Sequence, residues 1–167
     1  MTPMAVPPTR DELAKACRTA QTIGGALIVS LGVYAFVVNQ IQRMHAPFGG
    51  FAPGVPHDLL RWILAAVALA TLGLVRLLQR TIVANAALPP VRRLHSAAVV
   101  GLALCESVAI YGFVLFMVAG RASDFYVFTV LALIGFVLYF PRLQTWEERA
   151  RAMARDTAGR GITSPGT

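Results

Sequence analysis

The sequence predicts an all-α integral membrane protein with four transmembrane helices. Apolar residues make up 56% of its 167 residues and charged residues only 14%, whereas soluble domains are about half apolar and a quarter charged. Most charged residues lie between or outside four apolar segments, at residues 19–41, 59–79, 97–119 and 125–141. Each segment approaches or reaches the roughly 20 residues that a helix needs to cross the hydrocarbon core of a bilayer.

The first apolar segment is preceded by the pattern of a helix start. Thr9 and Glu12 have the spacing of a capping box, in which each side chain bonds the backbone N–H of the other residue. A short helix is therefore expected to run into the first span. The chain divides into an N-terminal segment (1–18), a four-helix membrane domain (19–141) and a C-terminal region (142–167).

The C-terminal region is expected to form an amphipathic helix and a disordered tail. The fourth apolar segment meets Pro141, which should end or kink its helix. Thr145 and Glu148 then repeat the capping-box spacing, with Trp146 between them as an expected interfacial anchor. Residues 158–167 are rich in small and polar residues and are expected to be disordered.

The distribution of Lys and Arg predicts that both termini face the cytoplasm. Three basic residues precede the first segment, four belong to the middle loop when Arg76, near the end of the second segment, is counted with it, and five follow the fourth segment. The first outer loop has two when Arg61, near the start of the second segment, is counted with it, and the second outer loop has one. Because cytoplasmic loops carry the excess of basic residues, the tails and the middle loop are assigned to the cytoplasm.

Other residue types argue against several classes of site. Cys17 and Cys105 are too few for a disulfide framework and are expected to be free thiols. His45 and His57, in the first outer loop, lack a Cys, Asp or Glu at metal-ligand spacing and are expected to be solvated. No catalytic grouping can be assembled, so neither an enzyme nor a cofactor is expected. The arginines form no run interleaved with aromatic residues, which argues against nucleic acid as a partner.

The two halves of the chain are similar in sequence. A shift of 77 residues lays the first apolar segment over the third, with eight identities in eighteen positions that include Gly, Ser and Tyr. The second and fourth segments align more weakly at a shift of 62 residues. This self-similarity fits two duplicated parallel hairpins, and it also fits chance similarity between apolar helices.

The third segment contains the one acidic residue that lies deep in a predicted span, Glu106. A carboxylate at the bilayer centre is costly, so Glu106 is expected to be protonated, paired or facing a wet interior. Ser107 follows it, and Ser30 and Thr71 fall at comparable depth in the first two segments, where they are expected to hydrogen-bond a neutral carboxyl. No basic residue lies at that depth, so Glu106 is the candidate functional residue.

The run Ala103-Leu-Cys-Glu-Ser-Val-Ala-Ile-Tyr-Gly112 resembles the carboxylate helix of the c subunit, the proteolipid of rotary F-type and V-type ATPases. The family pattern is Ala-Leu-x-Glu-small-x-Ala-Ile-Tyr-Gly, in which the Glu carries the transported proton. The resemblance implies that Glu106 binds a proton, with Tyr111 just over one turn away. Val108 stands where a sodium-type site has a hydroxyl, which favours a proton over sodium.

Two functions follow from these observations. In the first, the protein is a c-like subunit that takes part in proton translocation, in the inner or an equivalent energy-coupling membrane. Its partners would be the lipid bilayer and either other membrane subunits or copies of itself. In the second, it is a non-catalytic membrane anchor or accessory subunit, and the buried Glu only specifies how helices pack.

Overall fold

A computed structural model describes residues 9–52, 54–84 and 88–162 of the chain. Within them it contains five helices and no strand: α1 (Arg10–Met44), α2 (His57–Ala84), α3 (Pro90–Ala119), α4 (Ala122–Tyr139) and α5 (Leu143–Ile162). The first four are long and apolar enough to cross a membrane. The predicted all-α membrane fold with four spanning helices is therefore confirmed.

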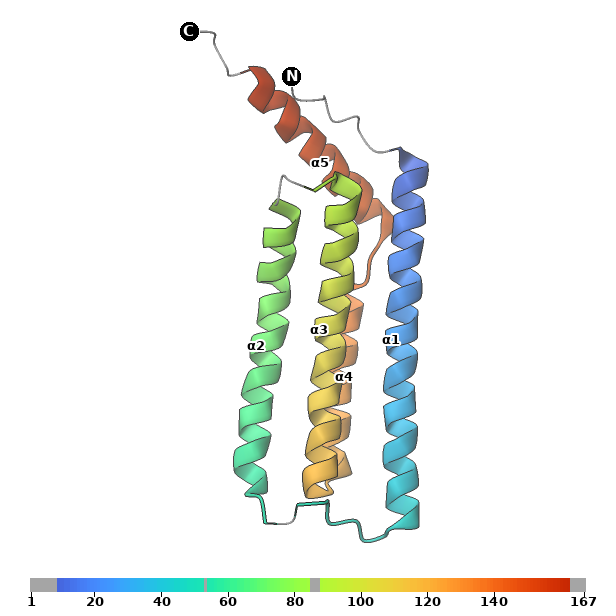
Figure 1. The fold of residues 1–167 in the computed structure, drawn as a ribbon, viewed down its shortest axis with the longest axis vertical. Helices are drawn as coiled ribbons and strands as arrows, with labels where there is room; N and C mark the ends of the chain where they lie inside the picture. The colour runs from blue at the N-terminus through green and yellow to red at the C-terminus, as the bar shows by residue number, and fades with distance from the viewer. Residues whose placement is uncertain (1–8, 53, 85–87, 163–167) are drawn as a thin grey trace.

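Helix α3 is the centre of the bundle (Figure 1). The first four helices run alternately up and down, α1 and α2 flank α3 on opposite sides, and α4 lies behind it. Helix α3 contacts each of the other four helices, whereas α1 and α2, over their described residues, make no contact with each other. The first pair is thus not a packed hairpin like α3 and α4, so the two halves of the internal repeat are not arranged alike.

Two glycines allow α3 and α4 to approach closely. A Cβ atom at Gly112 of α3 would lie 2.5 Å from Cβ of Phe128. A Cβ atom at Gly135 of α4 would lie 2.8 Å from Sγ of Cys105. Carbon atoms in contact are normally about 3.5–4.0 Å apart. Larger residues at either position would therefore push the two helices apart.

Helix α1 begins with the capping box that the sequence predicts. The Glu12 backbone N–H donates to Oγ1 of Thr9 over 3.3 Å, and the Thr9 N–H donates to Oε2 of Glu12 over 3.1 Å. The helix then continues without interruption through 35 residues. The short helix expected before the first span is thus the first part of α1.

Helix α5 differs from its prediction at both ends. It begins at Leu143, so Thr145 lies inside the helix and does not cap it. It continues through Ile162, so the expectation of disorder is wrong for residues 158–162. The rest of the predicted tail, residues 163–167, lies outside the described residues.

Trp146 is buried rather than placed as an interfacial anchor. Its side chain is only 4% exposed, in a cluster with Leu13 and Cys17 of α1 and Leu94 of α3. The first part of α5 thus packs its apolar side against the ends of α1 and α3. We call this end of the bundle the α5 end, and the opposite end the loop end.

At the loop end, the chain between α1 and α2 closes the end of α3. The N–H of Phe51 donates to the carbonyl of Met117 over 2.8 Å, and the N–H of Ala52 donates to that of Val118 over 3.2 Å. The last carbonyls of a helix have no partner within the helix. Gly120, with a φ of 74°, makes the turn that follows α3. The chain between α1 and α2 is therefore docked on the bundle.

Candidate functional site

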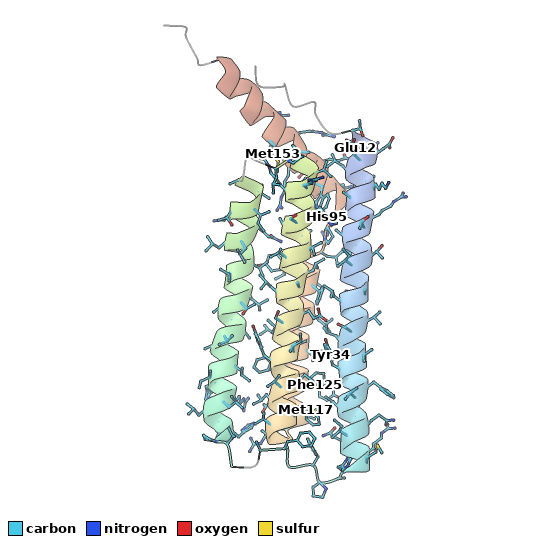
Figure 2. The ribbon with its side chains drawn as sticks, viewed as in Figure 1. Glu12, Tyr34, His95, Met117, Phe125 and Met153 are labelled. Carbon is cyan, nitrogen blue, oxygen red and sulfur yellow. The ribbon has the colours of Figure 1, made fainter. Side chains whose placement is uncertain are left out.

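The Glu106 carboxyl lies between α3 and α1. Its Oε1 atom is 2.5 Å from Oγ of Ser30 and 3.3 Å from the hydroxyl of Tyr34, which donates to it. Ser30 and Tyr34 are four residues apart on α1 and therefore share one face of that helix. Figure 2 shows Tyr34 between the two helices. Three side chains from two helices thus form one hydrogen-bonded group.

The Ser30 hydroxyl lies within reach of two oxygen atoms, one on Leu27 and one on Glu106. Oγ of Ser30 is also 2.6 Å from the carbonyl oxygen of Leu27. A serine hydroxyl carries a single hydrogen and cannot donate to both oxygens. If Ser30 donates to Leu27, the 2.5 Å contact needs a hydrogen from Glu106. If Ser30 turns toward the carboxyl instead, Glu106 accepts from both Ser30 and Tyr34.

The other polar residues expected at this site lie elsewhere. Oγ of Ser107 donates to the carbonyl of Ala103 over 3.0 Å, and Oγ1 of Thr71 donates to that of Val67 over 2.8 Å. Thr71 belongs to α2, which flanks α3 on the side opposite α1, so it cannot reach the carboxyl. A helix turns about 100° per residue, so Ser107 also points away from Glu106.

Tyr111, the tyrosine of the c-like pattern, does not contact Glu106 either. It is partly buried and packs against the main apolar cluster of the bundle. Tyr34 of α1 supplies a phenol hydroxyl to the carboxyl instead. The sequence analysis did not assign Tyr34 to the site, although its four-residue spacing from Ser30 is the signal that could have found it.

Glu106 lies at the edge of the bundle rather than in its centre. On α3, Ala103, Ile110 and Val114 are exposed and line up at helical spacing next to the partly buried Glu106. The fully buried residues of α3, such as Cys105 and Gly112, lie on the other side of the helix, against α4. A partner helix packed on this face would therefore come close to the carboxyl.

A second polar group, which the sequence analysis missed, joins α2 to α4 at the loop end. Asp124, 4% exposed, accepts from Nε2 of His57 over 2.8 Å and pairs with Nε of Arg61 over 3.4 Å. The side chain of His57 is only 15% exposed, so the expectation that it is solvated is wrong. Asp124 and His57 lie in the first turns of α4 and α2, which the fold brings to the same end.

Metal ligands do not gather in this group or in any other part of the chain that the structure describes. No set of three His, Cys, Asp or Glu side chains lies close enough together to hold an ion. The role best supported for the Asp124 group is that of an ionic link between the first turns of α2 and α4.

Comparisons with protein-family models, with characterised proteins and with solved structures gave no match for this chain. The resemblance to the c subunit therefore depends on the residues around Glu106 alone. A function has to be argued from the geometry of the Glu106 site.

Proposed function

We propose that this protein is a c-like membrane subunit whose Glu106 binds a proton within the membrane and takes part in proton translocation by a larger complex. The observation that carries the proposal is the short contact between Glu106 and Ser30. Because the Ser30 hydroxyl also lies within reach of the Leu27 carbonyl, it can turn between the two oxygens and leave the carboxyl as donor or as acceptor.

The same three residues suit a carboxyl that gains and loses its proton. When Glu106 is neutral and the Ser30 hydroxyl points to Leu27, the carboxyl can donate to Ser30 and accept from Tyr34. When it is ionised, a turn of the Ser30 hydroxyl away from Leu27 would give the carboxylate two donors. Ionisation in the membrane also needs water or a positive charge. Since Glu106 borders an exposed face of α3, a partner subunit could supply either.

The c-like resemblance adds an orientation to this proposal. The start of α1, the end of α2, the start of α3 and α5 all lie at the α5 end of the bundle (Figure 1). Most of the basic residues belong to these parts of the chain. The proposal therefore assigns the α5 end to the cytoplasm and the protein to the inner or an equivalent energy-coupling membrane.

The alternative function is a membrane anchor or accessory subunit. The bonds between Glu106 and α1 join two helices, and hydrogen bonds between spanning helices stabilise their packing by about 0.6 kcal/mol on average. In this case the carboxyl is structural, and the exposed face of α3 binds a partner helix.

The two functions are distinguished by two substitutions of the same residue in native membrane vesicles. Glu106→Gln keeps size and hydrogen bonding but cannot release a proton, whereas Glu106→Ala removes the bonds as well. The proposal predicts that Glu106→Gln leaves the mass of the complex in mild detergent unchanged and abolishes proton flux, measured with a pH-sensitive dye.

Chemical labelling gives a second readout. Dicyclohexylcarbodiimide should modify Glu106 and stop the flux, while Glu147 and Glu148 of α5 should react little. If Glu106→Gln retains full flux while Glu106→Ala loosens the complex, the anchor function is correct and the translocation proposal fails.

A further inference from the structure

A cavity of about 900 Å³ opens at the α5 end of the bundle. It lies between α2 and α5, and residues of α3 and of the end of α4 form its inner wall. Four arginines line it: Arg76 and Arg80 of α2, Arg142 before α5, and Arg149 of α5. Arg76 and Arg80 are four residues apart on α2 and share a helix face. Two arginines of α2, one residue that precedes α5 and one within α5 therefore line the same space.

The positive charge of this cavity has no ionic partner among the described residues. Among the residues that the structure describes, none of the four arginines forms an ion pair, and no acidic residue lines the cavity. The nearby Glu147 is already paired with Arg10 and Arg151. Arg76 lies eight residues before the end of α2, which is about 12 Å along the helix axis. A long arginine side chain near the end of a spanning helix can reach the headgroup level, where lipid phosphates lie.

The rest of the cavity is apolar and reaches the outer surface of the bundle. Its wall includes Leu94 of α3 and Val137 and Leu138 of α4. Val137 and Leu138 are each 69% exposed, so they extend from the cavity onto the face that lipid chains cover. Over their described residues, α2 and α5 make no contact with each other. A ligand with an anionic group and long apolar chains therefore fits the lining.

We propose that this cavity binds an anionic phospholipid. The phosphate would lie among the four arginines, and the acyl chains would run along the exposed residues at the end of α4. Basic cavities between spanning helices bind anionic lipid headgroups in this way. The proposal does not depend on the function of Glu106, because it requires only that the bundle lies in a membrane.

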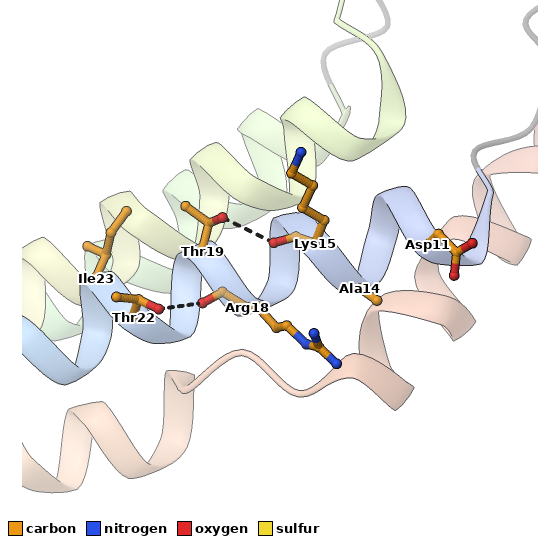
Figure 3. Close-up of a pocket in the computed structure, with 7 residues that line it drawn as sticks. All are labelled: Asp11, Ala14, Lys15, Arg18, Thr19, Thr22 and Ile23. Atoms are coloured by element: carbon orange, nitrogen blue, oxygen red, sulfur yellow. Dashed lines mark hydrogen bonds between the residues drawn. The ribbon is translucent and has the colours of Figure 1, made fainter.

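A shallower hollow at the same end provides the control residues. It is lined by seven residues of α1, among them the exposed cations Lys15 and Arg18 (Figure 3). Its two threonine hydroxyls already donate to the α1 carbonyls of residues 15 and 18. All of its lining comes from one helix, and its cations do not face those of a second helix. Lys15→Gln with Arg18→Gln thus removes two charges from the same end without changing the cavity.

The chain contains a fluorescent reporter for lipid in this cavity. Trp146 is one of its lining residues, and Trp62, the second tryptophan, is 70% exposed near the start of α2 at the loop end. Trp62→Phe leaves Trp146 as the sole tryptophan. The protein is placed in phosphatidylcholine vesicles that contain a minor fraction of phosphatidylglycerol, with brominated acyl chains on one lipid or the other. Bromine quenches tryptophan on contact, so the difference in quenching gives the preference for each lipid at Trp146.

We expect phosphatidylglycerol to be preferred over phosphatidylcholine at Trp146 by at least about tenfold. Each basic residue adds about fivefold to the attraction of an anionic lipid. Arg76→Gln with Arg80→Gln should lower the preference at least about fivefold, and so should Arg142→Gln with Arg149→Gln. The Lys15 and Arg18 pair should leave it unchanged. The second arginine pair lies outside the spanning helices, so it tests the cavity even if the first pair prevents insertion.

Three results would overturn the proposal. The first is equal quenching by the two brominated lipids at the same fraction. The second is a loss of preference in the Lys15 and Arg18 variant as large as in the arginine pairs, which would indicate general surface charge. The third is abolition of the preference by inorganic phosphate at millimolar concentration, which would identify a soluble phosphate compound as the ligand.

Discussion

The contact between Ser30 and Glu106 should appear as a coupling energy between α1 and α3. Ser30→Ala removes the oxygen that lies 2.5 Å from Oε1 of Glu106, and Tyr34 remains as the only partner of the carboxyl on α1. Hydrogen bonds between spanning helices contribute about 0.6 kcal/mol on average and about 1.7 kcal/mol at most. Because this contact is short and the carboxyl has no basic partner, we expect a coupling of about 1–1.7 kcal/mol.

The coupling is measured with a double-mutant cycle of Ser30→Ala and Glu106→Ala. The free energy of unfolding of the four proteins is determined in mixed micelles by titration with sodium dodecyl sulfate. Ser107→Ala is the matched control, because its hydroxyl donates to Ala103 of its own helix. The cycle of Ser107→Ala with Glu106→Ala should therefore show a coupling near zero. Equal coupling energies in the two cycles would refute the assignment of Ser30 as the partner of Glu106.

Three further predictions concern the bundle. A cysteine that replaces Gly54, which is exposed in the outer loop, should be labelled from the opposite side of the membrane to a cysteine placed on the exposed side of α5. The two native cysteines are buried and should not react. Labelling of the two introduced cysteines from the same side would contradict the topology. Gly112→Ala should lower the free energy of unfolding by about 1–3 kcal/mol through overpacking against α4, whereas Gly73→Ala, which meets open space, should not lower it. Asp124→Asn should lower the free energy of unfolding by about 1.5–3 kcal/mol. Asp58 has a side chain that is 86% exposed, so Asp58→Asn should lower it much less, and equal losses would argue against the ionic link.

The four spanning helices could be predicted because a bilayer requires a run of apolar residues of fixed length. The ends of the helices could not be predicted in the same way. Helix α1 begins at Arg10, nine residues before its apolar segment, because a helix continues into water where capping and packing stabilise it. Helix α5 begins before Thr145, and its residue Trp146 packs against α1 and α3, a contact that no local pattern indicates.

Part of the candidate site could also be predicted. Glu106 was identified because an acid in an apolar run is costly, and Ser30 because it falls at the same depth. The pattern of one helix does not reveal which neighbour its side chains face, so Thr71 of α2 was expected at the site and Tyr34 was not. The link between His57 and Asp124 joins residues 67 positions apart and depends on the fold alone.

The central position of α3 has a consequence for the order in which the protein is assembled. During synthesis, α1 and α2 enter the membrane first, and in the finished bundle they do not contact each other. Neither helix can gain its native interactions until α3 has been inserted, since α3 contacts both. A chain that stops after α2 would therefore hold two separate helices in the lipid, exposed to membrane quality control, and the bundle would form only once the span that carries Glu106 has been made.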